Sequence, residues 1–126
     1  MHRSQLCGML IDCSEETFED GVAFWSQALG KKALRPDDTT DPYVELEGGA
    51  NGLYLLLQRV GAASRVHLDI ETDNVEAEVR RLEVLGAVRE AAIASWWVMR
   101  APTGHLFCVV PQQAGHTLEQ AAVWAD

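Results

Sequence analysis

The stretch RVHLDIETDNVEAEVRRLEVLGA, residues 65–87, decides the fold. Its first six residues alternate apolar and polar side chains, which predicts a β-strand with one buried face. Asp73 and Glu76 then form a D-x-x-E capping pattern, and apolar residues recur at helical spacing up to Leu85. Gly86 follows at the place where a left-handed residue ends a helix. The stretch therefore predicts a strand followed by a helix.

The same order of elements occurs earlier in the chain. Gln5–Cys13 is an apolar run of strand character, and Ser14 after it is the expected N-cap of a helix that ends at Gly30. The two strands share the similar tripeptides LID and HLD, and the two helices end in ALG and VLG. We interpret the matched Asp12 and Asp69 as strand-end acids that cap the following turns. The chain is therefore predicted to be an internal duplication.

Three further strands are expected after each helix, separated by turn-rich segments. In the first half the expected strands are Lys32–Arg35, Tyr43–Glu47 and Gly52–Val60, with turns at Pro36–Pro42 and Gly48–Gly52. In the second half they are Val88–Ile93, Ser95–Ala101 and His105–Pro111. The prediction is a single α+β domain over residues 1–126, made of two βαβββ units at 5–60 and 65–111. A short amphipathic helix is expected at residues 116–126.

Composition excludes several classes of partner. The 126 residues carry 10 Lys and Arg against 19 Asp and Glu, a net charge of −9, which disfavours nucleic acid and anionic membranes. No apolar run approaches the roughly 20 residues that span a bilayer, and the N-terminal apolar stretch is too short for a secretion signal. Cys7, Cys13 and Cys108 lack metal-type spacing and indicate reduced thiols. A cytoplasmic protein is expected.

The element order, with residues 65–87 and WVMRAPTGHLFCVVP at residues 97–111, resembles the vicinal oxygen chelate superfamily. Within it, the match is to small glyoxalase-like proteins related to bleomycin-resistance proteins. This resemblance, over about residues 5–111, implies a cupped mixed sheet with helices on its convex side, and a homodimer. The superfamily includes isomerases, lyases, dioxygenases and binding proteins, so the function has to be argued from the site.

In this family a metal often sits in the cup on four side chains, one from the first and last strand of each unit. Transferred position by position, the resemblance places these slots on Leu10, Gln58, His67 and Cys108. Leu10 cannot bind a metal, and Cys108 stands where the family usually has Glu, so neither a metal nor another cofactor is expected. The alternative is a divalent metal held by His67 and Gln58 with Cys108 or Asp69 as a substitute ligand.

The candidate ligand-binding residues follow from these slots and from strand alternation. His67 is the candidate catalytic residue, because an imidazole with a pKa of about 6.5 suits a proton shuttle. Trp96 and Trp97 face opposite ways on a strand, and the one facing the cup forms a wall for a planar ligand. Arg100 either clamps an anionic group or ends its strand in solvent. The candidate set is His67, Gln58, Cys108, Tyr54, Trp96, Leu10 and Arg100.

Three functions compete on these observations, and whether the chain is an enzyme stays open. The first is metal-independent binding of a small apolar or aromatic molecule in the cup, which the aliphatic Leu10 favours. The alternative is a metal-dependent lyase, isomerase or dioxygenase. The second alternative is an interaction module, in which the tail around Trp124 and a sheet edge make a dimer.

Overall fold

The computed structural model describes residues 1–48, 53–62 and 65–126. It divides into a first unit, Gly8–His67, and a second unit formed by Met1–Cys7 together with Leu68–Asp126. Strands β1 (His2–Ser14) and β5 (Arg65–Thr72) each contribute residues to both units.

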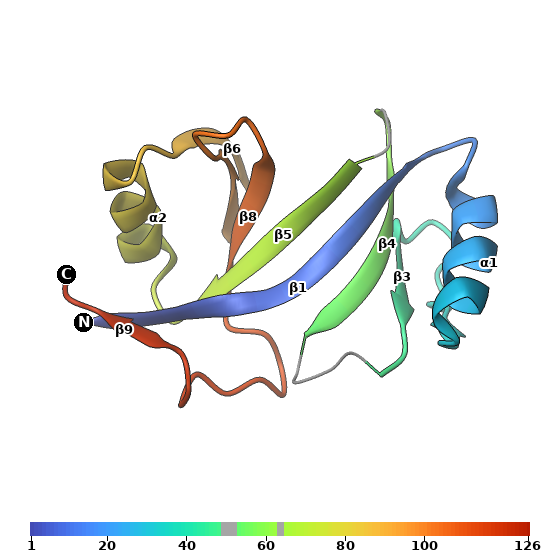
Figure 1. Ribbon diagram of the computed structural model, residues 1–126, viewed down its shortest axis with the longest axis horizontal. Coiled ribbons are helices and arrows are strands. Elements are labelled where there is room, and N and C mark those ends of the chain that lie inside the picture. The colour runs from blue at the N-terminus through green and yellow to red at the C-terminus, as the bar shows by residue number, and fades with distance from the viewer. Residues whose placement is uncertain (49–52, 63–64) are drawn as a thin grey trace. The chain divides into compact units, whose positions relative to one another are not determined.

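The sheet of the first unit has the strand order β2-β3-β4-β1. Strand β1 pairs in parallel with β4, whereas β4 pairs antiparallel with β3 and β3 antiparallel with β2. Helix α1 packs against β4 on one side of this sheet (Figure 1). The elements are α1 (Phe18–Leu29), β2 (Ala33–Leu34), β3 (Tyr43–Leu46) and β4 (Tyr54–Val60).

The sheet of the second unit repeats this topology with the order β5-β8-β7-β6. Strand β5 pairs in parallel with β8, and β8, β7 and β6 follow as antiparallel neighbours, with α2 against β8 (Figure 1). The elements are α2 (Val75–Val84), β6 (Val88–Ile93), β7 (Trp96–Arg100), β8 (Leu106–Pro111) and β9 (Ala122–Trp124). The predicted α+β duplication of βαβββ units is thereby confirmed.

Each unit has its own apolar core between its helix and its sheet. In the first unit, Phe18 and Val22 of α1 pack on the buried strand residues Leu46 and Leu57. In the second unit, the core is formed by Val79, Leu82, Met99 and Val109. These cores identify which face of each sheet lies beneath a helix, and alternation along the strands then assigns the other face.

The helices end where predicted, but they do not begin there. Gly30 has a left-handed φ of 64° as the C-cap of α1, and Gly86 has a φ of 104° just after α2. The predicted N-cap Ser14 is wrong, since Ser14 is the last residue of β1 and the cap is Thr17. In α2 the cap is Asn74, whose side chain accepts a hydrogen bond from the backbone N–H of Ala77 at 3.0 Å.

The predicted tail helix over residues 116–126 is also wrong. The chain there contains the short strand β9, which pairs antiparallel with the start of β1, His2 with Trp124 and Ser4 with Ala122. The indole Nε1 of Trp124 donates to the Ser4 hydroxyl at 2.8 Å. Residues 122–124 are extended because backbone pairing with β1 and this indole contact replace the hydrogen bonds of a helix.

The remaining predicted strands differ from the observed ones by one or two residues at their ends, apart from the early part of β1. The predicted turn Gly48–Gly52 and the start of the predicted strand Gly52–Val60 lie largely outside the described residues. Within the described part of the chain, neither helix combines the length and the apolar character needed to cross a membrane.

Candidate functional site

The face of the first unit's sheet that lies opposite α1, named the helix-free face of the first unit, carries the candidate polar residues of this unit. Cys13 and Leu57 pack in the core beneath α1, with Ile11 beside them. The alternate residues of β1 and β4 therefore turn to the helix-free face. The predicted site residues on this face are Leu10, Tyr54, Gln58 and His67.

A buried carboxylate organises the polar part of this face. Asp12 is fully buried, and its Oδ2 accepts hydrogen bonds from the Nδ1 of His67 at 2.8 Å and from the Nε of Arg65 at 2.9 Å. The His67 side chain is only 8% exposed. Charge-assisted hydrogen bonds of this length fix the orientation of an imidazole ring. Asp12 thus orients the His67 ring.

Tyr54 and Gln58 complete the face on β4. Gly8 pairs with Tyr54 across the strands, and a Cβ atom on Gly8 would stand 2.1 Å from a ring carbon of Tyr54. The absence of a side chain at Gly8 therefore gives the tyrosine ring its place. The side-chain amide of Gln58 donates to the hydroxyl of Tyr43 at 3.3 Å. The face combines an aromatic ring, an amide and an imidazole around the buried, aliphatic Leu10.

The face of the second unit's sheet opposite α2, named the helix-free face of the second unit, carries the other candidates. Trp97 packs against the core beneath α2, which settles that Trp96 faces the other way. Cys108 is the register partner of Asp69 on one side and of Val98 on the other. The predicted residues on this face are Trp96, Arg100 and Cys108.

Arg100 is engaged at the end of β7. Its Nε donates to Glu90 at 2.6 Å, and its Nη1 donates to the backbone oxygen of Gly104 at 3.0 Å. The guanidinium therefore ties its strand to neighbouring chain segments. This arrangement matches the strand-end alternative that the sequence left open beside the anion clamp.

Asp12 is the residue whose role the sequence pattern conceals. The pattern indicates a strand-end acid that caps a turn, whereas Asp12 is fully buried and bonded to two basic side chains. The available signal was its position two residues after Leu10, because residues at i and i+2 on a strand share a face. A buried carboxylate needs a charged or hydrogen-bonding partner, and His67 supplies one.

The four metal slots of the family do not fit this chain as a set. The Leu10 side chain offers no donor atom and is only 3% exposed. The metal cage of the family takes one ligand from the first strand, and in this chain Leu10 stands at that position. These four positions therefore do not form the four-ligand cage of the family.

A separate groove of about 490 Å³ lies along α1 in the first unit. Phe24, Trp25 and Val66 supply apolar surface to it, and Phe24 is 61% exposed. Of the described residues that line this groove, none belongs to the set predicted from the sequence. Asp12 and its partner Arg65 also line this groove, so a molecule bound there is the alternative to one on the helix-free face of the first unit.

A protein-family model described as a glyoxalase-like domain matches residues 8–110 of the chain. No curated protein matches it. Solved structures do match at low sequence identity. A hypothetical protein from Bacillus halodurans is 13% identical, with a TM-score of 0.61 over 90% of this chain and 98% of its own.

Two structures of named enzymes share the fold. Methylmalonyl-CoA epimerase from Mycobacterium tuberculosis is 15% identical, with a TM-score of 0.54 over 86% of this chain and 87% of its own. A variant of 4-hydroxymandelate synthase from Streptomyces coelicolor is 12% identical, with a TM-score of 0.60 over 91% of this chain and 50% of its own. At these identities the likeness concerns the fold. The family match confirms the predicted resemblance to glyoxalase-like proteins, and the solved structures share the fold.

Proposed function

Because the chain belongs to the family of glyoxalase-like domains, we propose that it binds a small apolar or aromatic molecule without a metal ion. The proposed contacts are Leu10, Tyr54, Gln58 and His67, all on the helix-free face of the first unit. Trp96 and Cys108, on the helix-free face of the second unit, stay predicted contacts. Arg100 is a weaker candidate, since its guanidinium is engaged by Glu90.

The observation that carries the proposal is the pair formed by Asp12 and His67 beside the buried Leu10. Small-molecule sites combine apolar and aromatic walls with a few polar groups that are held in place. Tyr54 supplies an aromatic wall, and the hydrogen bond of 2.8 Å from His67 to Asp12 holds the polar group. The aliphatic side chain of Leu10, at the β1 position of the family's ligand set, suits an apolar ligand and cannot bind a metal.

The experiment is a fluorescence titration of the full chain with 2-naphthol, after treatment with a chelator. We expect saturable binding of one molecule, unchanged when zinc, nickel, manganese or ferrous iron is added. The variant Tyr54→Ala removes the aromatic wall and should weaken binding about tenfold or more. The matched control is Phe24→Ala, which removes an exposed aromatic ring from the groove along α1 and should leave binding unchanged.

Three outcomes would contradict the proposal. An absence of saturable binding excludes this class of ligand. Binding that requires an added divalent ion excludes the metal-independent form of the proposal. Loss of binding in Phe24→Ala, with Tyr54→Ala unaffected, moves the site to the groove along α1.

A metal-dependent lyase, isomerase or dioxygenase is the second candidate, and the same Asp12–His67 contact favours it. Histidines that bind metals commonly donate their second ring nitrogen to a carboxylate, which orients the ring. The test is metal analysis of untagged protein together with melting curves. Less than about one tenth of an equivalent of any divalent ion, and no change in Tm on adding those ions, would exclude this candidate.

A further inference from the structure

The two oxygens of the Asp12 carboxylate have different surroundings. Oδ2 accepts both hydrogen bonds, from Arg65 and from His67. Oδ1 is buried and has no hydrogen-bond partner among the residues that the structure describes. Buried polar atoms in folded proteins nearly always have a partner, and an orphaned carboxylate oxygen therefore requires an explanation.

Neighbouring donors are directed elsewhere. Gln58 is the register partner of Asp12 on β4, but its amide nitrogen donates to the hydroxyl of Tyr43 at 3.3 Å. Arg65 donates to the other oxygen, Oδ2, through its Nε. The described residues thus hold the carboxylate in a fixed orientation, and none of them donates a hydrogen bond to its Oδ1 atom.

By strand alternation Asp12 belongs to the face on which ligand binding is proposed, and it also lines the groove along α1. Asp12 follows Leu10 by two residues on β1 and shares a face with it, and its partner His67 is a proposed contact. Ile11 and Cys13, on either side of Asp12 in the chain, pack towards α1 instead. Asp12 is therefore placed to meet a molecule that lies against Leu10 and His67.

We propose that Asp12 Oδ1 accepts a hydrogen bond from an O–H or N–H group of the bound molecule. The inference rests on the proposed function and narrows it to apolar or aromatic molecules that carry a hydrogen-bond donor, as phenols and aromatic amines do. A carboxylate accepts hydrogen bonds and does not donate them. A site built this way discriminates against an analogue that lacks the donor, because the carboxylate oxygen then stays unpaired.

The experiment compares three naphthalenes that have nearly the same shape. 2-Naphthol carries a donor, 2-methoxynaphthalene carries an oxygen that only accepts, and 2-methylnaphthalene carries neither. Wild-type protein should bind 2-naphthol about tenfold or more tightly than either of the other two. In Asp12→Asn the side-chain oxygen can keep Arg65 and His67 while an NH₂ group replaces Oδ1, so the preference for 2-naphthol should fall below about twofold. The control Asp20→Asn, an exposed acid on α1, should retain it.

The outcomes separate this inference from the proposed function. If none of the three compounds binds, the proposed function fails. If all three bind wild-type protein equally, or if 2-methoxynaphthalene binds as tightly as 2-naphthol, the inference fails while the proposed function stands. Retention of the full preference in folded Asp12→Asn also overturns it. The wild-type comparison decides the matter even where Asp12→Asn does not fold.

Discussion

The ring of Tyr54 occupies the space that a side chain at Gly8 would need. A Cβ atom on Gly8 would stand 2.1, 2.3 and 2.6 Å from three of the ring carbons. The two residues are register partners on β1 and β4, so this contact is built into the pairing of the strands.

Gly8→Ala should therefore displace the Tyr54 ring and lower the free energy of unfolding by about 1–3 kcal/mol, the usual cost of overpacking. Urea denaturation measures this change. In the Tyr54→Leu background the same substitution should cost much less, because the ring is gone. An equal cost in both backgrounds would show that the two residues do not interact.

Glu78 should contribute far more to stability than its neighbour on the same helix, Glu76. Glu78 is fully buried, and its carboxylate receives hydrogen bonds from His2, Ser4 and Arg81. Glu78→Gln removes the counter-charge of Arg81 and one of the two carboxylate partners of His2, and should cost about 3–5 kcal/mol in the free energy of unfolding. Glu76→Gln breaks only exposed pairs with Arg89 and Arg80 and should cost less than about 1 kcal/mol. Similar costs in urea denaturation would contradict the assigned burial.

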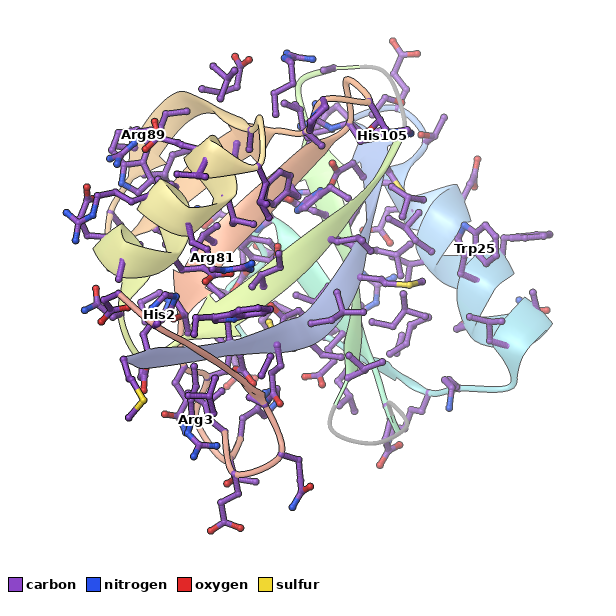
Figure 2. All side chains as sticks on the ribbon, turned by 60° about the vertical axis from the view of Figure 1, so that its left-hand side comes forward. His2, Arg3, Trp25, Arg81, Arg89 and His105 are labelled. Atoms are coloured by element: carbon purple, nitrogen blue, oxygen red, sulfur yellow. The ribbon has the colours of Figure 1, made fainter. Side chains whose placement is uncertain are left out.

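The stability of the second unit should fall as pH rises above neutrality, because of His2. Burial alone would lower the pKa of this imidazole, but hydrogen bonds to Asp126 and Glu78 outweigh it and raise the pKa above its ordinary value. Figure 2 shows His2 beside Arg81, the other basic partner of Glu78. Since the folded state holds the proton more tightly, the contribution is complete below about pH 6.5 and is lost as pH rises through the raised pKa.

The check is the free energy of unfolding from urea curves between about pH 5.5 and 9, in wild type and in His2→Gln. Wild type should lose stability over this range, and the difference between the two proteins should shrink as pH rises. A difference that stays constant or grows with pH would contradict the role of His2.

The stability that Glu78 contributes should instead fall as pH is lowered. Burial would raise the pKa of this carboxyl, but hydrogen bonds from Arg81 and His2 lower it, so acid removes its contribution.

The three thiols should differ in reactivity. Cys7 and Cys13 are buried, whereas Cys108 is partly exposed. Burial first, and the charge of Asp12 second, raise the pKa of the Cys13 thiol, which keeps it protonated and unreactive. Reaction of native protein with dithionitrobenzoate at about pH 8, followed by peptide mass spectrometry, should modify Cys108 first and Cys13 much later. Early modification of Cys13 would be incompatible with this burial, and denatured protein provides the three-thiol control.

The duplicated fold could be predicted because period-two alternation and helical stripes are local signals that the sheet and helices both obey. The faces of Leu10 and His67 were likewise predictable from alternation. The caps at Thr17 and Asn74 were not. Thr17 makes no side-chain capping hydrogen bond, so its side chain gives no signal, and the polar neighbours of Asn74 offer a similar side-chain oxygen. The role of Asp12 was hidden because its partners Arg65 and His67 lie more than fifty residues away in the chain.

The tail required information that no local pattern contains. Residues 116–126 have an apolar spacing that suits a short helix, yet β9 forms there. The indole of Trp124 donates to Ser4, and the guanidinium of Arg81 lies 3.8 Å from the centre of the Trp124 ring. These partners come from distant parts of the sequence. A helix this short is marginal without tertiary support, so tertiary contacts decided the conformation.

The pairing of β9 with His2–Ser4 has a consequence for how this protein meets other proteins. Unpaired strand edges are templates on which another chain can add a strand, and short covering strands are one way in which proteins suppress this. Strand β9 satisfies backbone groups at the start of β1 and fastens itself there through Trp124. By covering this edge of β1, the C-terminal segment should prevent another chain from adding a strand there. Substitutions that remove the Trp124 contacts should therefore lower the solubility of the protein before they unfold it.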